Sequence, residues 1–381
     1  MYKFYKNYLL DTISFWEKYS IDKKYGGYFT CLDRMGRVYN TAKYAWLQGR
    51  QIWMFSKLYN EFEKREKWIK IAEKGVSFLL KHFFDKDGRI YFKVSREGRP
   101  LHKPKKIYSE VFAVIGLSEY AKAVNDTKLM NFAKELYWKI IKWKNIPEMF
   151  SRNVYPVKGV STLAIPMVIL NITQEMREKV PDIRYKSIVD NCINEIYQHI
   201  KPEYKAVFEN IKNGKVFFDI PEGRLINPGH VIEAGWFLLH EGMFNNNNDL
   251  INQALKIIEW SLNIGWDKKY GGILYFIDFK GLPTEQLEWD MKLWWVHSEA
   301  IYATLLAYKL TDDKKFKDWH KKIFDWSFKH FADKKYGEWY GYLHRDGSIS
   351  LDLKGGIWKG CFHLPRALFY CMNLFKKSKS T

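Results

Sequence analysis

Several common sequence signals are missing from this chain of 381 residues. It has no run of eighteen apolar residues, and its first stretch, MYKFYKNYLLDTISFWEKYS, has neither an apolar core region nor a small-residue cleavage site. These absences argue against a membrane-spanning helix and a secretory signal. We therefore expect a soluble, cytoplasmic protein with no membrane partner.

Cysteine is scarce, and other metal and phosphate motifs are absent. The sequence shows no CxxC spacing, no HExxH pattern and no GxxxxGK[ST] phosphate loop, although residues 158–162 (Lys-Gly-Val-Ser-Thr) form a short fragment of the Gly/Ser type. Buried thiols in a reducing compartment are expected for the four cysteines, Cys31, Cys192, Cys361 and Cys371. We expect no metal site.

Charge of one sign is in excess, because 62 Lys and Arg residues face 43 Asp and Glu residues and give a net charge of +19. An anionic partner such as nucleic acid is the first hypothesis for such a chain. The basic residues, however, are spread along the whole sequence and mixed with acidic ones, as in Glu-Phe-Glu-Lys-Arg-Glu-Lys at 61–67. This pattern is typical of solvated helix faces, so we expect no nucleic-acid partner.

Aromatic residues are abundant, at 18% of the chain, within 47% apolar residues overall. This content is sufficient for a large core and excludes disorder. Aromatic side chains also line concave pockets, where the CH faces of a sugar ring stack on them.

A short loop sequence is repeated. Asp-Lys-Lys-Tyr-Gly-Gly occurs at 22–27 and 267–272, and Asp-Lys-Lys-Tyr-Gly-Glu follows at 333–338. The last two copies are 66 residues apart, and the first two are separated by about four such units, which predicts further copies. Degenerate copies follow at 85 and 208, and a weak one at 148. We predict one domain over 1–381 with repeats that start near 22, 85, 148, 208, 267 and 333.

Each repeat combines a short hairpin with a pair of helices. The predicted hairpin turns are 33–36, 95–98, 220–223, 278–281 and 344–347, each flanked by strand-forming residues. Apolar residues at three and four spacing predict helix pairs at 46–60 with 68–82, 111–123 with 129–143, 231–239 with 250–262, and 299–310 with 316–331. The last helix, 364–375, has only the first helix, 5–18, as a partner. This shared pair favours an all-α (α/α)6 barrel with short β-hairpins at one end over an open solenoid.

Polar residues follow the turn glycines at similar offsets. The inner helices of such a barrel begin where the hairpins end, so these residues are expected to converge on one mouth of the barrel. The offsets are seven to sixteen residues and select Arg50, Glu110, His230, Glu233, His297 and His363, and Glu299 follows His297 directly after Ser298. His297 and Glu299 are two residues apart and diverge on a regular helix, so they share a pocket only if the helix starts there.

Each of these residues also has a purely structural interpretation, as a core histidine, a helix-tying pair or a partner for a buried carboxylate. Together they suit proton transfer at a carbon atom next to a carbonyl. Two histidines on opposite faces of a substrate can remove and return a proton near neutral pH. An arginine can stabilise the anion between the two steps, and glutamates can hold the histidines. This set predicts epimerisation beside a carbonyl.

Longer motifs resemble the N-acylglucosamine 2-epimerase (renin-binding protein) family from about residue 15 to 372. They are Tyr-Gly-Gly-Tyr-Phe-Thr-Cys-Leu-Asp-Arg at 25–34, Trp-Leu-Gln-Gly-Arg-Gln-Ile-Trp-Met-Phe at 46–55, Asn-Pro-Gly-His-Val-Ile-Glu-Ala-Gly-Trp at 227–236, Lys-Leu-Trp-Trp-Val-His-Ser-Glu at 292–299, and Lys-Gly-Gly-Ile-Trp-Lys-Gly-Cys-Phe-His at 354–363. The resemblance implies an (α/α)6 barrel, commonly a homodimer, that interconverts N-acetylglucosamine and N-acetylmannosamine through an enediolate. It implies no cofactor for the chemistry, and ATP as an allosteric activator of some members.

The resemblance also implies roles for single residues. His230 and His363 would be the acid/base pair, with Arg50, Glu233 and Glu299 required around them. Substrate contacts are expected from His297, Glu110, Trp46, Gln48, Trp236 and Trp295. Val296 departs from the family, which often has proline before the histidine, and repeat three is divergent around 147–171.

Other functions share parts of this pattern. Cellobiose 2-epimerases and mannose isomerases use similar histidines, but their first-repeat motif differs from Trp-Leu-Gln-Gly-Arg. An (α/α)6 glycoside hydrolase would use Glu233 and Glu299 as its carboxylate pair and give the histidines no role. A sugar-binding barrel without catalysis is the remaining alternative.

Overall fold

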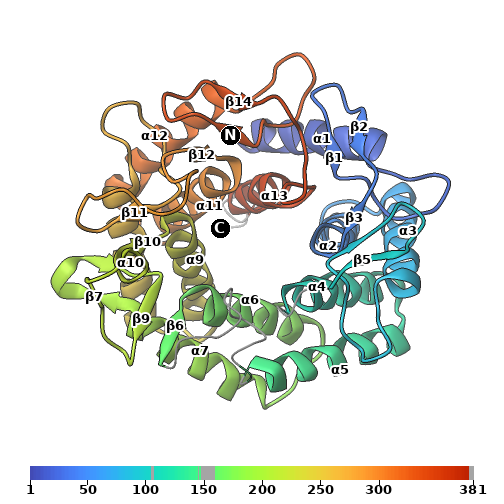
Figure 1. Ribbon diagram of the computed structural model, residues 1–381, viewed down its shortest axis with the longest axis horizontal. Coiled ribbons are helices and arrows are strands. Elements are labelled where there is room, and N and C mark those ends of the chain that lie inside the picture. Colours follow the sequence, from blue (N-terminus) through green and yellow to red (C-terminus); the bar gives the residue numbers. More distant parts are fainter. Residues whose placement is uncertain (104–106, 145, 147–158, 377–381) are drawn as a thin grey trace.

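The long helices form two concentric rings (Figure 1) in a computed structural model that describes residues 1–103, 107–144, 146 and 159–376. The inner ring contains α2 (Ala45–Glu61), α4 (Tyr108–Val124), α6 (Ala164–Lys179), α9 (Pro228–Phe244), α11 (Trp294–Thr311) and α13 (His363–Lys376). The outer ring contains α1 (Tyr2–Tyr19), α3 (Glu66–His82), α5 (Thr127–Lys144), α7 (Tyr185–His199), α10 (Asn248–Gly265) and α12 (Lys314–His330). The predicted (α/α)6 barrel is confirmed.

Apolar patterning decides which helix is inner and which is outer. In α11 every residue from 294 to 307 is buried, as expected of a helix with neighbours on all sides. In α12 the buried residues are Phe316, His320, Ile323 and Ser327, which form a single stripe at three and four spacing. The outer helices therefore cover the inner ring with one face and leave the other face to solvent.

The first and last helices close the ring. α1 packs on α13, as predicted, and the indole N–H of Trp16 in α1 donates to Glu338 at 2.6 Å. The inner wall closes between α2 and α13, where the Trp53 ring lies 5.3 Å from that of Phe362. The amino-terminal helix thus takes the outer position that the last repeat lacks.

The inner helices begin earlier than predicted. α11 starts at Trp294 instead of residue 299, and α9 starts at Pro228, where proline needs no N–H partner in the first turn. Asn227 caps α9 by accepting the N–H of His230 at 3.2 Å. Both differences lie at the amino-terminal ends of the helices, where the candidate site residues are found.

Short antiparallel strands connect neighbouring repeats at one end of the barrel. Their bounds are β1 (Cys31–Leu32), β2 (Val38–Asn40), β3 (Lys43–Tyr44), β4 (Lys93–Val94), β5 (Pro100–His102), β6 (Val160–Thr162), β7 (Ile200–Lys201), β8 (Ala206–Val207), β9 (Asn210–Lys212), β10 (Leu225–Ile226), β11 (Ile277–Asp278), β12 (Lys292–Leu293), β13 (Tyr342–Leu343) and β14 (Ile349–Leu351). The strands just before α2, α6, α9 and α11 each pair with a strand of the following repeat, in the order β3–β4, β6–β9, β10–β11 and β12–β13.

Two predictions for the hairpin end need correction or lie outside the described residues. The turn predicted at 220–223 is a short helix, α8 (Pro221–Arg224), because proline in the first turn favours a helical start. Turns at 33–36, 95–98 and 344–347 do join paired strands. The weak repeat start near 148 lies outside the residues that the structure describes.

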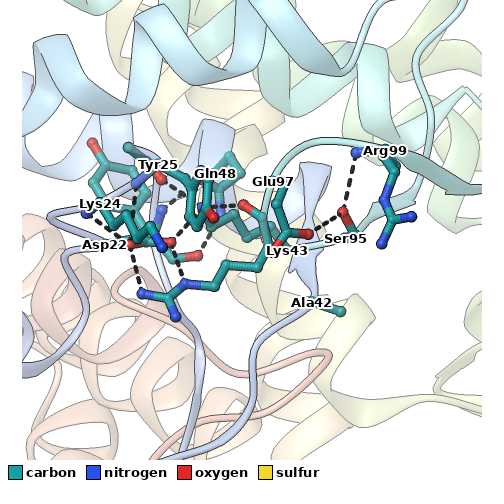
Figure 2. A network of polar contacts seen from close by, with 12 residues as sticks. Asp22, Lys24, Tyr25, Ala42, Lys43, Gln48, Ser95, Glu97 and Arg99 are labelled. Atoms are coloured by element: carbon teal, nitrogen blue, oxygen red, sulfur yellow. Dashed lines mark hydrogen bonds and ion pairs between the residues drawn. The ribbon is translucent and has the colours of Figure 1, made fainter.

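The repeated loop positions one charged group three times. Asp22 accepts from Lys43 and from Arg96, both at 3.0 Å, and Figure 2 shows Asp22 beside Lys43 in this network. The same arrangement recurs at Asp267, which binds Lys292 and Arg345. In each case the lysine precedes the inner helix of the same repeat, and the arginine comes from the hairpin turn of the next repeat.

The third copy closes the ring in the same way. Asp333 binds Lys354 of its own repeat at 3.0 Å and Arg34 of the first hairpin at 2.7 Å. The next repeat after the sixth is therefore the first. The repeated hexapeptide holds neighbouring hairpins together.

Two further observations concern the whole of the described chain. Its helices include none that is both long enough and apolar enough to cross a bilayer. All four cysteines are buried free thiols, as predicted.

Candidate functional site

The first turns of the inner helices present side chains to the barrel mouth on one face only. In α2 this face carries Trp46 and Arg50, which are four residues apart and therefore stacked on the same side of the helix. In α11 the corresponding pair is Trp295 and Glu299. Residues midway between the members of each pair point to the opposite side.

Glu299 is the centre of the site. One of its carboxylate oxygens, Oε1, accepts from His363 Nδ1 and from the Arg366 guanidinium, both at 2.7 Å. The other, Oε2, accepts the indole N–H of Trp236 at 3.0 Å. Burial raises the pKa of Glu299, whereas Arg366 and Trp236 favour the charged form. Every hydrogen bond of this buried carboxylate thus serves to hold another group of the site.

Arg366 joins two carboxylates. Its Nη2 group donates to Glu233 at 2.8 Å as well as to Glu299. Although burial opposes the charge, these carboxylates raise the pKa of Arg366. His363 and Arg366 are three residues apart in the first turn of α13, and so they lie on the same face.

Glu233, Glu299 and His363 place three ligand-type atoms within 4.8 Å of one another. A metal ion would favour such a set of oxygen and nitrogen donors. In this protein, however, the Arg366 guanidinium bonds both carboxylates and supplies the positive charge between them. The donor set therefore fits an arginine-centred network better than a metal site.

His363 is buried and held by its Nδ1 atom, so Nε2 is the ring nitrogen that can exchange a proton with a substrate. Burial lowers its pKa well below the ordinary value, and the nearby Arg50 charge lowers it further. The imidazole is therefore neutral at physiological pH, which is the form needed of a base.

His230 is held in the same way by a second carboxylate. Its Nδ1 atom lies 3.0 Å from Glu209 Oε2, and the other Glu209 oxygen accepts the Thr162 hydroxyl at 3.0 Å. Burial opposes ionisation of Glu209, but His230 lowers the pKa of this carboxyl overall. An ionised Glu209 stabilises the protonated form of His230.

Trp295 stands between the two histidines. Its ring centroid is 5.7 Å from that of His230 and 5.8 Å from that of His363. The two carboxylate-bound imidazoles thus flank one aromatic side chain, on which the apolar face of a sugar can pack.

Arg50 completes the charged cluster. Its guanidinium carbon lies 3.9 Å above the Phe112 ring and 5.0 Å from the Phe362 ring, which adjoins His363. Burial lowers the Arg50 pKa to about 9, while Glu233 and Glu299 favour its charge. The side chain remains a cation at neutral pH. Its Nε atom is buried and has no hydrogen-bond acceptor among the described residues.

His297, Gln48 and Glu110 do not join this cluster. The Ile273 N–H donates to His297 Nε2 at 2.9 Å, and His297 Nδ1 donates to the Leu293 carbonyl at 2.8 Å. Burial lowers the His297 pKa to about 3. Both ring nitrogens are occupied by backbone groups, so the expected substrate contact from His297 is replaced by a structural role.

Gln48 and Glu110 have the same role in other repeats. Gln48 bonds both backbone groups of Tyr28 at 2.9 Å. Glu110 accepts the Ile90 N–H at 2.9 Å and pairs with Arg89 at 2.6 Å. In these three repeats the helix residue holds the backbone N–H that follows the loop, and the substrate contacts expected from Gln48 and Glu110 give way to this structural role.

The remaining sequence predictions divide in two. Trp236 is 1% exposed and donates its indole N–H to Glu299, so it orients this carboxylate from the buried side of the cluster. Trp46 and Trp295 lie on the face that meets the mouth. Arg50, Glu233, Glu299 and His363 are brought together, and His230 lies across Trp295 from His363.

Two residues of the site were missed from the sequence. Arg366 had a usable signal, because it follows His363 by three residues in a predicted helix. Glu209 had none, since it lies between β8 and β9 and reaches His230 across 21 residues of chain. The sequence pattern around residue 208 predicts only a degenerate copy of the repeated loop and no catalytic residue.

Comparison with known proteins adds an independent line of evidence. The N-acylglucosamine 2-epimerase (GlcNAc 2-epimerase) family model matches residues 27–367. N-acylglucosamine 2-epimerase of Bos taurus is 38% identical over 368 residues, which cover 94% of this chain and 87% of the bovine protein.

Solved structures show the same fold. The cellobiose 2-epimerase of Spirochaeta thermophila superposes with a TM-score of 0.84 at 20% identity and covers 100% of this chain and 97% of its own. A D-mannose isomerase gives a TM-score of 0.84 at 19% identity, with 97% of each chain covered.

Proposed function

This chain belongs to the N-acylglucosamine 2-epimerase family, and from that premise we propose that it interconverts N-acetylglucosamine and N-acetylmannosamine. It is thereby a carbohydrate epimerase of the isomerase class. The two carboxylate-bound histidines on either side of Trp295 supply the chemistry that such a reaction needs.

The proton is transferred at C2 of the open-chain sugar. One imidazole removes the C2 proton through Nε2, and the electron pair of the C–H bond moves into the C1 carbonyl to leave an anion on the C1 oxygen. The other imidazole then protonates C2 from the opposite face, and the C1 carbonyl re-forms. The histidine that acts as base ends with the proton from C2, and the other, which starts protonated, ends neutral.

Arg50 is suited to stabilise the C1 oxyanion. It is cationic, packed between two aromatic rings, and close enough to His363 to affect that residue's pKa. A fixed positive charge in a dry site stabilises developing negative charge more strongly than solvent does. Arg366 is already engaged by Glu233 and Glu299, so Arg50 is the better candidate.

The observation that carries the proposal is that both histidines are anchored by Nδ1 to a buried carboxylate. This arrangement fixes the ring orientation and directs the second nitrogen of each imidazole to the substrate, as in other histidine-based acid/base sites. A glycoside hydrolase would need Glu233 and Glu299 free to act, but both are bound by Arg366.

Incubation with N-acetylglucosamine in heavy water tests the proposal. We expect N-acetylmannosamine to form and deuterium to appear at C2 of both epimers. Parallel incubations with cellobiose and mannose, analysed for ketose products, separate the related epimerase and isomerase activities. Absence of C2 exchange with every sugar would contradict the proposal.

The homodimer and nucleotide activation remain predictions from the resemblance, and the cytoplasmic location remains a prediction from the missing signal and membrane segments. We assign the proton-transfer and oxyanion roles to side chains of this chain, and on that assignment we propose chemistry that requires no nucleotide. Adding ATP to the heavy-water assay measures any activation directly, and light scattering of the purified protein gives its mass in solution.

A further inference from the structure

Five aromatic side chains form a group at the barrel mouth beside Arg50. They are Trp46, Phe92, Tyr108, Phe112 and Trp358, and we refer to them as the mouth aromatics. The centroid of the Trp46 ring lies between 5.3 and 5.7 Å from each of the other four. They come from α2, α4, the residue just before β4 and the segment before α13, so the fold assembles them from three separate repeats.

The mouth aromatics adjoin the charged cluster directly. Trp46 precedes Arg50 by one helical turn on the same face of α2, a rise of about 6 Å. Phe112 connects the two, because its ring contacts Trp46 at 5.7 Å and the Arg50 guanidinium at 3.9 Å. A molecule held at Arg50 therefore reaches the mouth aromatics with a substituent only a few bonds long.

One member of this group is open to solvent, although Phe112 is buried. Trp358 is 45% exposed, whereas Trp16, Trp53 and Trp68 are fully buried. A large exposed aromatic beside a polar site is typical of ligand-binding surfaces. The charged cluster can bind oxygen and exchange protons, but it offers no apolar surface comparable to this one.

One polar atom of the group also lacks a partner. The indole N–H of Trp46 is buried and finds no acceptor within the part of the chain that the structure describes. An unsatisfied buried donor is costly, and a carbonyl oxygen from a ligand would satisfy it. The combination of apolar rings and one N–H donor matches an acyl group, which presents a methyl or alkyl end and a carbonyl oxygen.

We propose that the mouth aromatics are the subsite for the N-acyl group of the substrate. The inference rests on the proposed function, and it names the feature that separates N-acyl amino sugars from plain aldoses. With the C1 oxygen at Arg50, the acyl group on the C2 nitrogen extends one helical turn toward Trp46. The methyl packs among the rings.

The test compares sugars with and without the acyl group. Initial rates of C2 epimerisation are measured for N-acetylmannosamine, N-butyrylmannosamine and mannose with the wild type, Trp46→Ala and Trp358→Ala. Phe244→Ala is the matched control, because Phe244 is 62% exposed at the opposite end of α9. Trp46→Phe keeps a ring and removes the N–H, and thermal unfolding confirms that each variant is folded.

We expect Trp46→Ala and Trp358→Ala to lower kcat/KM for N-acetylmannosamine by roughly tenfold or more relative to mannose, the scale of lost apolar contacts in a pocket. The longer butyryl chain should recover part of the loss by filling the space. Trp46→Phe should show a smaller loss confined to acylated sugars, and the control should resemble the wild type.

An equal loss for all three sugars would overturn the inference, because it would mean that the mouth aromatics stack on the hexose ring. Unchanged ratios in folded variants would overturn it as well. Both outcomes leave the proposed function intact as long as the wild type epimerises N-acetylmannosamine. A wild type that epimerises none of these sugars would instead contradict the proposed function.

Discussion

His297 and Glu299 lie two residues apart in α11 and serve opposite sides of the inner wall. His297 accepts the Ile273 N–H at 2.9 Å behind the wall, whereas Glu299 contacts His363 at 2.7 Å in front of it. Two residues along a helix amount to a turn of about 200°, so neighbouring polar residues need not share a function. This relationship separates the residues that hold the loops from those that face the substrate.

The two histidines should contribute separately to proton exchange. We expect His363→Asn and His230→Asn each to lower epimerisation by at least about a hundredfold, the usual scale for losing a general acid or base. Each variant retains one base and should still exchange the C2 proton of one epimer with heavy water. Nuclear magnetic resonance of the C2 position checks this. Near-normal epimerisation in either variant would remove that histidine from the acid/base pair.

Glu209 should act through His230. Glu209→Gln keeps the size of the side chain but removes the charge that favours the protonated imidazole, and we expect kcat to fall by roughly tenfold to a hundredfold with a smaller change in KM. The pH dependence of kcat should change, because the carboxylate that contacts His230 Nδ1 is lost. Thr162→Val, which removes only the hydroxyl bound to the other Glu209 oxygen, is the milder comparison. An unchanged pH profile in Glu209→Gln would contradict this role.

The protonation state of His363 should depend on Arg50. Burial and the Arg50 charge lower the His363 pKa, so the neutral imidazole should persist at about pH 6, where an ordinary histidine is largely protonated. Replacing Arg50 by leucine removes the positive charge and should raise the His363 pKa toward its ordinary range, and it should also lower kcat. Nitrogen chemical shifts of labelled histidine report the protonation state of His363 in the wild type and in the variant, and steady-state kinetics report kcat. A protonated His363 at this pH in the wild type would be inconsistent with the structure.

His297 should matter for stability more than for catalysis. His297→Leu leaves the buried Ile273 N–H without an acceptor and should lower the free energy of unfolding by about 1–3 kcal/mol. His297→Gln is the matched variant, because Gln48 bonds the equivalent N–H of Tyr28 in the first repeat. Denaturant unfolding measures the loss, and activity per folded molecule should stay close to that of the wild type. A folded His297→Gln protein without activity would place His297 in the chemistry after all.

The repeated aspartates should make the fold sensitive to acid. Burial favours the neutral form of Asp22, but Arg96 and Lys43 lower its pKa from 3.8 to about 2. Because the folded-state pKa is depressed, the stabilisation is complete above about pH 4 and disappears as the pH falls toward 2. Asp22→Asn should cost at least about 2 kcal/mol at neutral pH. Its deficit relative to the wild type should shrink across that acid range, as followed by circular dichroism.

Much of the fold could be predicted because the pattern of apolar residues and turn glycines within each repeat is visible over a short stretch of sequence. Apolar residues at three and four spacing located the helix pairs, and the turn glycines located most of the hairpins. The helix starts are predicted too late in α9 and α11, because α9 begins with Pro-Gly-His and α11 with two tryptophans, and neither start shows the apolar stripe of three and four spacing. Pairing between strands of different repeats carries no such local signal.

The sequence could predict the position of the candidate site residues along each helix only to within about one turn, and not the side of the helix on which they lie. Counting from the turn glycines places Arg50, Glu233 and His363 at the correct end of the barrel. The same count included Glu110 and His297, since hairpin lengths differ between repeats and an offset does not say which side of a helix a residue occupies. Glu209 could not be found in this way, because its partner belongs to a different element and the contact depends on the folded ring.

The contact between Arg34 and Asp333 spans 299 residues of the chain. A second contact that closes the ring, from Trp16 to Glu338, spans 322 residues of the chain. A ring closed by such distant residues is complete only when both ends of the chain are present, so its earliest-made hairpin stays without its final neighbour until the last repeat has been synthesised. We therefore expect the first repeat to be the part of the nascent chain that depends longest on chaperones.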